Sequence, residues 1–305
     1  LGSPLAMTVE NLDHGVWEGV MGPLEVDAQA AAKRRLSSPR PGHADLAGGL
    51  KYGRRDLRDV LERASARETA VRVAAGAVCR QLLAACGVEV KSGVLSVGPV
   101  SLEEPREGFS FATLAKVDDA SPFRAVDPAL EEKMTQAVDA AAKKGDTLGG
   151  TILLAARGVP PGLGSHVSWD RKLDGRIGQA MLSIPSVKAV SIGSGVSNAF
   201  APGSLAHDPI SWSEERGFFR ERNRAGGLEG GITNGEDVLV VLFQKPIATL
   251  REGLPSVDVD TKAPHRAQYE RSDVTAVPAC GVIGKAMLAL VLADALLEKT
   301  GGDSM

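Results

Sequence analysis

The sequence predicts an α+β fold, in which helices and strands are mixed along the chain without strict alternation. Segments with apolar residues at helical spacing occur beside short apolar runs typical of strands, but they do not follow the regular order of βαβ units. The segment at residues 284–299 is apolar on nearly all sides, which is typical of a helix buried against another element or subunit. A layered α+β arrangement is therefore favoured over a doubly wound parallel sheet.

The first half of the chain predicts two helices followed by strands. Residues 27–35 form a short helix, which ends at the Ser- and Pro-rich segment 37–42. Residues 56–83 are predicted to be one long helix because their apolar residues recur at helical spacing, and Gly87 follows where a terminating glycine is common. Residues 88–100 alternate around a glycine turn, which predicts strands.

The second half of the chain predicts three helices and three strands. Residues 128–144 are a helix with Asp127 as the N-cap and Gly145 as the stop signal. The remaining predicted elements are, in chain order, a strand at 151–156, a helix at 170–183, strands at 187–192 and 237–243, and the apolar helix at 284–299.

The composition excludes several classes of protein. The 305 residues suit one large domain or two ordinary ones, and 43% hydrophobic residues are enough for a core. The balance of 35 basic and 38 acidic residues argues against a general nucleic-acid binder. No apolar run reaches the roughly 18 residues of a membrane helix. We expect no nucleic-acid partner and no membrane partner.

The cysteines and the first residues suggest where the protein works and how the sequence begins. Three cysteines without a CxxC spacing support neither a disulfide framework nor a zinc site, and HExxH is absent, so we expect no metal and a reducing cytoplasm. Leu1 is not a methionine, and residues 1–10 lack the basic start of a signal peptide. We expect the sequence to begin inside a longer protein.

Two polar segments in the first half are candidate functional sites. His43 follows a Pro–Gly turn in residues 40–45, where an imidazole suits acid–base chemistry; the alternative is an ordinary loop histidine. Arg63 and Arg67 are four residues apart on the predicted helix, with Ser65 between them, and they suit phosphate binding. The alternative is a charged helix face that pairs Arg with Glu.

Three further segments lie in the second half. Residues 223–235 hold five glycines, which implies close backbone approach to a ligand or another chain, or simply a glycine-rich turn. Residues 245–249 place a Lys and a Thr after a strand, where they suit an anion; the alternative is a surface Lys. Arg271 and Asp273 are two residues apart on an extended stretch and therefore share one face, either as an ion pair or as an anion-binding Arg beside a carboxylate base.

These segments resemble one known family. The motifs are RPGHAD at residues 40–45, SARETA at 65–70, GVPPGLGSHVSWDRKLD at 158–174, GGITNG at 230–235 and RSDVTAVPA at 271–279. In this order they resemble chorismate synthase of the monofunctional, bacterial type, from Leu1 to about Leu297. The resemblance implies a β-α-β sandwich with sheets covered by helical layers, forming one domain over residues 1–305.

The resemblance also implies an activity. Chorismate synthase converts 5-enolpyruvylshikimate 3-phosphate to chorismate and phosphate, the last step of the shikimate pathway. The reaction is a 1,4-elimination without net redox change that nevertheless requires reduced FMN. The family is cytoplasmic and typically homotetrameric. A separate flavin reductase would supply the reduced flavin, so that NADPH is involved only indirectly.

The resemblance assigns roles to individual residues. His43 would exchange a proton with the reduced flavin, and Asp273 would help to remove the C6 hydrogen of the substrate. The other implied flavin contacts are Arg63, Ala64, Ser65, Ser186, Gly230, Lys245, Pro246, Ile247, Ala248, Thr249 and Arg271. The other implied substrate contacts are Arg40, Ser65, Ala66, Arg67 and Arg271.

The sequence departs from the family pattern at three places. Pro185 and Ser186 stand where some relatives have Asn–Ala, and Lys285 stands where the family usually has Glu. This Lys would shift local pKa values or be a neutral surface change. The GESHG segment and the arginine-rich stretch with which the family begins are absent. We therefore expect a chain that lacks its N-terminal strands and one of two catalytic histidines.

Two other functions remain open from the sequence. One is an inactive or truncated homologue that binds FMN, or completes an oligomer, without turnover. The other is a metal-dependent phosphoesterase that uses His43 and Asp45, although two such side chains do not make a metal site by themselves.

Overall fold

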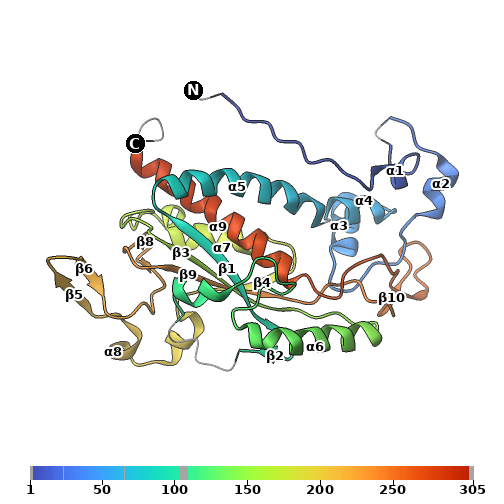
Figure 1. The fold of residues 1–305 in the computed structure, drawn as a ribbon. Coiled ribbons are helices and arrows are strands. Elements are labelled where there is room, and N and C mark those ends of the chain that lie inside the picture. The colour runs from blue at the N-terminus through green and yellow to red at the C-terminus, as the bar shows by residue number, and fades with distance from the viewer. Residues whose placement is uncertain (1–2, 23, 65, 103–108, 302–305) are drawn as a thin grey trace.

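A five-stranded antiparallel sheet forms the centre of the protein (Figure 1). The computed structural model describes residues 3–22, 24–64, 66–102 and 109–301. The strand order is β2-β1-β3-β9-β4, and every pair of neighbours is antiparallel. The strands are β1 (Glu89–Val97), β2 (Val100–Ser101), β3 (Gly150–Arg157), β4 (Val187–Ile192) and β9 (Val238–Gln244).

The two central strands are apolar on both faces because both faces of the sheet are covered. Along β3, Ile152 and Leu154 belong to one hydrophobic cluster, whereas Leu153 belongs to a second cluster on the opposite face. In β9, Val240 and Val241 divide between the same two clusters. This two-sided burial explains the continuous apolar runs of these strands.

Three helices cover the first face of the sheet. They are α5 (Thr69–Ala85), α7 (Leu173–Leu182) and α9 (Val277–Thr300). α9 lies directly on β1 and β3, and a Cβ at its Gly284 would come within 2.8 Å of Leu242. α5 packs along α9, where a Cβ at Gly76 would come within 2.5 Å of Ala286. Small residues therefore set the close approach of the helices to each other and to the sheet.

The opposite face is covered more thinly, by the 3-10 helix η2 (Phe111–Lys116), while α6 (Glu131–Lys143) packs on β1 and β2 (Figure 1). Phe111 and Leu114 of η2 are buried against the sheet. Gly93 in β1 permits this cover, because a Cβ there would lie 2.8 Å from Leu114.

Short elements surround the sheet. The N-terminal ones are α1 (His14–Trp17), α2 (Ala28–Lys33), α3 (Asp45–Tyr52), α4 (Arg58–Arg63) and the 3-10 helix η1 (Ala66–Glu68). The later ones are η3 (Pro128–Leu130), η4 (Trp169–Arg171), η5 (Gly195–Phe200), α8 (Gly203–Ala206) and the hairpins β5–β6 (Ile210–Ser213, Gly217–Arg220), β7–β8 (Leu228–Glu229, Ile232–Thr233) and β10–β11 (Pro255–Val257, Pro264–Arg266). α3, α4 and β10 lie at one end of the molecule, and β8 lies at the other (Figure 1).

The structure confirms the α+β fold and every predicted strand. It also confirms the cap of the predicted helix at 128–144, where the Asp127 carboxylate accepts a hydrogen bond from the Ala129 N–H at 3.0 Å and the helix ends before Gly145 in a left-handed conformation. The first turn of this helix is the 3-10 helix η3.

The single helix predicted over residues 56–83 is wrong. The chain forms α4, then η1, and then α5, which begins at Thr69. Between Leu61 and Val71 the sequence holds no large apolar residue, so no continuous apolar stripe holds the two helices together. Arg63 and Arg67 consequently do not lie on one continuous helix face, and Ser65 lies outside the described residues.

The last helix is longer than predicted, since it begins at Val277 rather than at residue 284. Pro278 in its first turn is compatible with a helix start. With 24 residues and a mean hydropathy of 2.0 over its most apolar stretch, α9 is long and apolar enough to cross a bilayer. Its packing against α5 and the sheet accounts for the same composition, because a core helix between two layers is also apolar.

Candidate functional site

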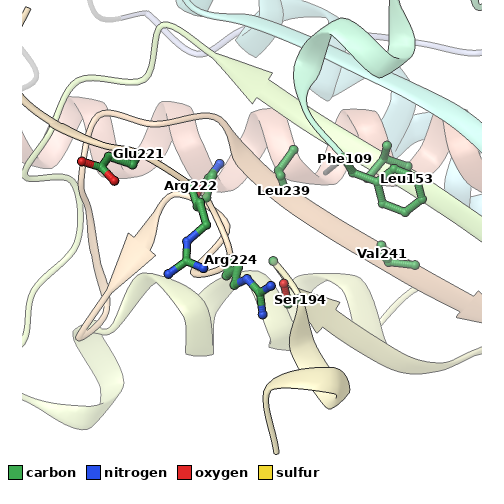
Figure 2. A pocket seen from close by; sticks show the side chains of 10 residues that line it. Phe109, Leu153, Ser194, Glu221, Arg222, Arg224, Leu239 and Val241 are labelled. Atoms are coloured by element: carbon green, nitrogen blue, oxygen red, sulfur yellow. The ribbon is translucent and has the colours of Figure 1, made fainter. Parts of the chain in front are cut away.

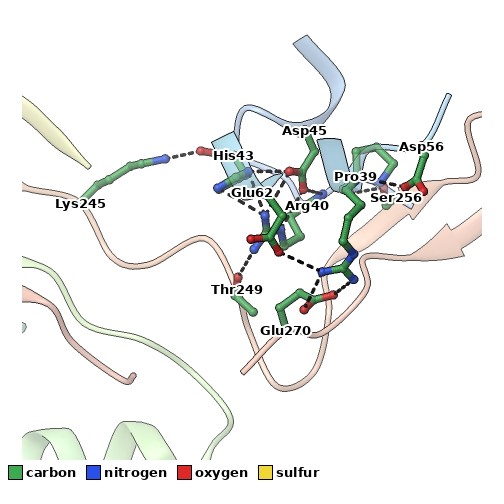
Figure 3. Close-up of polar contacts among 12 residues, drawn as sticks. Pro39, Arg40, His43, Asp45, Asp56, Glu62, Lys245, Thr249, Ser256 and Glu270 are labelled. Atoms are coloured by element: carbon green, nitrogen blue, oxygen red, sulfur yellow. Dashed lines mark hydrogen bonds and ion pairs between the residues drawn. The ribbon is translucent and has the colours of Figure 1, made fainter. Parts of the chain in front are cut away.

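The loop at residues 40–45 holds a buried network of three polar side chains (Figure 3). His43 Nδ1 lies 2.6 Å from Asp45 Oδ1, and Arg40 Nε donates to Asp45 Oδ2 at 2.8 Å. The backbone N–H of Arg40 donates to the same oxygen at 3.1 Å. The Asp45 side chain is fully buried, that of Arg40 is 7% exposed, and that of His43 is 22% exposed. The loop thus presents an imidazole that rests on a buried ion pair.

The local sequence produces this arrangement. Gly42 has φ +80°, a left-handed conformation that turns the chain between Pro41 and His43. Asp45 is the first residue of α3, so its carboxylate lies at the positive end of the helix dipole and beside the residues that precede the helix. His43 and Asp45 therefore face each other although only two positions separate them.

The Asp45 carboxylate is ionised. Burial alone would raise its pKa, but the hydrogen bonds from His43 and Arg40, together with their charges, outweigh burial and hold the pKa well below its usual range. Both oxygens of this carboxylate are already bound by Arg40 and His43, which leaves little capacity for a metal ion. Among the described residues, no group of three or more His, Cys, Asp or Glu is placed to hold a metal.

The segment at residues 245–249 packs against this loop from more than 200 positions away. Arg40 Nη1 donates to Thr249 Oγ1 at 2.7 Å, and Lys245 Nζ donates to the Gly42 carbonyl (Figure 3). Thr249 is buried, whereas Pro246 is exposed. Burial lowers the pKa of Lys245, and the nearby charge of Lys188 lowers it further. Two lysines at this point favour an anionic ligand group.

Ser186 joins the same region through the backbone. The Lys245 N–H donates to the Ser186 carbonyl at 3.0 Å, and Ser186 has φ +71°, which is uncommon for a residue with a side chain. Gln244, the residue before Lys245, has a buried Oε1 with no hydrogen-bond partner among the described residues. A buried acceptor without a donor is costly, so this oxygen suits the N–H or O–H of a ligand.

A second network lies beside the first and contains the predicted substrate-binding Arg67. Its Nη1 lies 3.3 Å from Glu62 Oε2, and Glu62 Oε1 lies 3.5 Å from Arg58 Nη1. Arg58 is buried, and its Nη2 donates to Glu270 Oε1 at 2.7 Å (Figure 3). The side chain of Arg67 is 47% exposed and remains accessible to a ligand. The residues next to it in sequence, Arg63 and Ala66, are exposed, and Ala64 is half-buried.

Arg271 and Asp273 follow Glu270 and are both exposed. Arg271 Nη2 lies 3.9 Å from Asp13 Oδ2, and Asp273 makes no hydrogen bond or ion pair within the described part of the chain. The Ser272 hydroxyl between them donates to the Thr249 carbonyl at 3.4 Å. This contact joins the predicted carboxylate base to the segment that holds Arg40.

Gly230 does not join this site within one chain. It lies in the β7–β8 turn with φ +60°, 4.0 Å from His166 for a Cβ at that position. The adjoining Gly162 lies near Lys299 at the C-terminal end of α9, whereas Arg271 and Asp273 precede its N-terminus. At 1.5 Å per residue, α9 separates these two regions by roughly 36 Å (Figure 1).

Lys285 is not a surface residue, which excludes one of the two interpretations of this departure. Its side chain is 12% exposed, and its Nζ lies 3.8 Å from Asp119 Oδ1. Burial lowers the pKa of Lys285; Asp119 opposes this shift, whereas Arg80 and two further cations add to it. The position therefore holds a half-buried cation whose charged neighbours are mostly cations.

A cavity of about 360 Å³ lies on the opposite, thinly covered face of the sheet (Figure 2). Phe109, Leu153 and Leu239 form its apolar wall, while Arg222 and Arg224 lie on its polar side. Two of its lining residues, Asn223 and Arg224, belong to the glycine-rich segment 223–235 that the sequence marked as a candidate site.

Comparison with known proteins identifies the family. The sequence model that describes the chorismate synthase family matches residues 1–297 of this chain. This chain belongs to the chorismate synthase family.

Individual relatives agree with this assignment. Proteins named chorismate synthase from Symbiobacterium thermophilum and from a strain of Thermus thermophilus are 52% and 54% identical to the chain over 308 and 304 residues. Each alignment covers 100% of this chain and 78% of the relative. A crystal structure of chorismate synthase matches with a TM-score of 0.74 at 45% identity, covering 86% of this chain and 72% of the other. The chorismate synthase fold is thereby confirmed.

Sequence reasoning missed the residues that hold the predicted chorismate synthase site together. Arg58 and Glu270 were not singled out, and Glu62 entered only through the alternative of a charged face that pairs Arg with Glu. The spacing of Arg58 and Glu62 by four residues is a recognisable signal on a helix. Glu270 carries no such signal, because its partner is 212 positions away.

Proposed function

We propose that the protein is a chorismate synthase in activity as well as in family. It would act as a lyase on 5-enolpyruvylshikimate 3-phosphate, with loss of the 3-phosphate and of a C6 hydrogen and without net redox change. The observation that carries this proposal is the junction of residues 40–45 with residues 245–249, where Lys245 binds the loop that holds the partly exposed imidazole of His43. An acid–base group beside a cation suits an anionic substrate that loses phosphate and a proton.

The residues at this junction fit reduced FMN. Lys245 and Lys188 favour an anionic group such as the flavin phosphate, and Gln244 offers a buried acceptor to an N–H or hydroxyl donor. The loop 245–249 and Ser186 would hold the cofactor, together with Arg63, Ala64 and the predicted contact Ser65. When bound, reduced FMN supplies transient electron density that promotes cleavage of the C–O bond.

The remaining roles fall to side chains of this chain. His43 would hold and move a proton at the cofactor, for which an imidazole is suited near neutral pH. The exposed Asp273 carboxylate would help to remove the C6 hydrogen, and Arg67 and Arg271 would bind the anionic groups of the substrate. In this structure the donors of Arg40 are engaged by Asp45 and Thr249, so its predicted contact with substrate has less support.

The wider context follows from the resemblance. We propose that the protein acts in the cytoplasm as a homotetramer, with reduced flavin supplied by a separate reductase at the expense of NADPH. Gly230 contributes to the cofactor site in this scheme only if another copy of the chain supplies it, because the two regions of one chain lie at opposite ends of α9.

An anaerobic assay tests this proposal. The full-length protein is mixed with reduced FMN and 5-enolpyruvylshikimate 3-phosphate, and chorismate is followed by its absorbance. Turnover that requires reduced FMN is expected. Flavin binding without turnover would instead support the inactive homologue, and turnover without flavin would contradict the proposed cofactor.

A further inference from the structure

We propose that Asp45 and Arg40 are positioning residues that hold the neutral His43 ring in the tautomer with its proton on Nδ1. Nε2 is then the nitrogen that takes up and returns a proton. The assignment of the tautomer stands on the geometry of the loop alone. What His43 does with the proton rests on the proposed function.

The contact between His43 and Asp45 determines which ring nitrogen carries the proton. An ionised carboxylate has no proton to donate, so the 2.6 Å contact between Asp45 Oδ1 and His43 Nδ1 places the proton on Nδ1. Asp45 is fully buried and surrounded by donors, and its pKa lies well below the usual range. The carboxylate therefore stays an acceptor throughout the physiological pH range.

Arg40 holds the Asp45 carboxylate in a fixed orientation. Oδ2 accepts from the Arg40 backbone N–H at 3.1 Å and from Nε at 2.8 Å, while Oδ1 accepts from Nη2 at 3.1 Å. The far side of the guanidinium is held by Thr249 Oγ1 at 2.7 Å. The contacts with Arg40 are enough to fix the plane of the Asp45 carboxylate without any contribution from His43. In this orientation, Oδ1 is the oxygen that faces the ring.

The second nitrogen of the His43 ring, Nε2, has different surroundings. The His43 side chain is 22% exposed, in contrast to the fully buried Asp45, so the ring remains accessible while its Nδ1 edge is occupied. Arg40 Nη2 lies 3.3 Å from Nε2 and 3.0 Å from Nδ1. A protonated Nδ1 cannot accept from this guanidinium, so Nε2 is the ring nitrogen that keeps its lone pair and can accept a proton, with Arg40 Nη2 beside it.

The unmodified protein provides the first test. The chain has five histidines, so a ¹⁵N-histidine spectrum at a pH where the rings are neutral resolves few signals, and His43 is assigned by its loss in His43→Gln. The chemical shifts of the two nitrogens report the tautomer directly. We expect a protonated Nδ1 and an unprotonated Nε2, whereas a predominant Nε2–H tautomer would overturn the proposal.

Asp45→Asn provides the second test. Arg40 directs two donors, its backbone N–H and Nε, at the Oδ2 position but only Nη2 at Oδ1. The amide oxygen of the variant should therefore take the Oδ2 position. The amide N–H₂ then faces His43 Nδ1 and donates to it, which moves the ring proton to Nε2. If His43 keeps its Nδ1 proton in a folded Asp45→Asn protein, Asp45 does not determine the tautomer.

Asp56→Asn is the matched control. Asp56 also accepts two backbone N–H groups near the same loop, from Leu36 at 3.0 Å and from Arg58 at 2.9 Å, and it does not contact His43. The Asp56→Asn substitution removes one negative charge, as Asp45→Asn does, and should leave the tautomer of His43 unchanged. If Asp45→Asn does not fold, the spectrum of the unmodified protein still decides the assignment.

Kinetics separate this proposal from the proposed function. In Asp45→Asn, kcat should fall roughly 10²-fold or more while the Kd for reduced FMN changes little, because the ring presents its proton from the wrong nitrogen. A tautomer that switches without loss of kcat would refute the role of Nε2. The expected tautomer in a protein that produces no chorismate would refute the proposed function and leave the positioning role intact.

Discussion

At the level of single residues, the candidate site depends on a few contacts within one loop. The sequence predicted His43 as an acid–base candidate from its place after a Pro–Gly turn, but it did not predict the pairing with Asp45. That pairing exists because the left-handed backbone of Gly42 turns the chain and because Asp45 begins α3. Arg40 illustrates the same limit, since its partner Thr249 lies 209 positions away.

Replacement of His43 by Ala should lower the rate more than the affinity. Because the imidazole moves a proton rather than holding the substrate, kcat should fall roughly 10²- to 10⁴-fold while KM changes little. Anaerobic initial rates over a range of substrate concentrations measure both quantities. His207→Ala, at an exposed histidine, is the control and should behave like the unmodified protein. An unchanged kcat in His43→Ala would remove this residue from the mechanism.

Lys285→Glu should stabilise the protein, because it removes a cation from a position where burial and neighbouring cations disfavour one. Among the described residues, the half-buried Lys285 faces the cations Arg80, Arg124 and Lys91 and one opposite charge, Asp119. A carboxylate therefore suits the position better. Urea unfolding at pH 7 measures the difference.

The pH dependence of this difference has a definite sign. Because burial lowers the pKa of the Lys285 ammonium in the folded state, the unfolded state binds more protons at alkaline pH. The contribution of this Lys to the free energy of unfolding should therefore rise with pH between the lowered pKa and its ordinary value of 10.5, and this rise should be absent in Lys285→Glu. A less stable variant at pH 7 would contradict the described charge environment.

At the element scale, the sequence predicted the long elements well and the short ones poorly. β3 and β9 were predicted because burial on both faces leaves a continuous apolar run, and α6 because its cap and stop residues are present. The hairpins β5–β6, β7–β8 and β10–β11 were missed, since strands of two to four residues are too short to show a period. The sequence predicted α4 and α5 as one helix. Both segments have apolar residues at helical spacing, and the short break between them contains no large apolar residue that could reveal a change in this spacing.

The contact between α5 and α9 provides a test at this scale. Gly76→Ala should destabilise the protein by about 1–3 kcal/mol, because the new Cβ would lie 2.5 Å from the Ala286 Cβ and 2.8 Å from its carbonyl oxygen. Gly178→Ala, in the interior of α7, has open space and should instead stabilise by about 0.5–1 kcal/mol. Thermal or urea unfolding distinguishes the two variants. Equal effects would show that α5 and α9 do not approach as described.

At the scale of the whole molecule, the site assembles segments that are distant in sequence. Residues 40–45, 58–62, 186, 245–249 and 270–273 meet at the end of the molecule where α9 begins. Composition and periodicity do not place these segments together, and the family resemblance alone suggested it. Gly230 is the exception among the predicted contacts, because the fold places it at the other end of α9. The single domain predicted over residues 1–305 remains a prediction.

The most direct test of the central claim is the stoichiometry of the reaction. The full-length protein is incubated anaerobically with excess 5-enolpyruvylshikimate 3-phosphate and a small amount of reduced FMN, and chorismate, phosphate and flavin oxidation state are measured together. We expect one phosphate per chorismate, many turnovers per flavin, and flavin that is still reduced at the end. Phosphate without chorismate, or flavin oxidised in proportion to product, would contradict it.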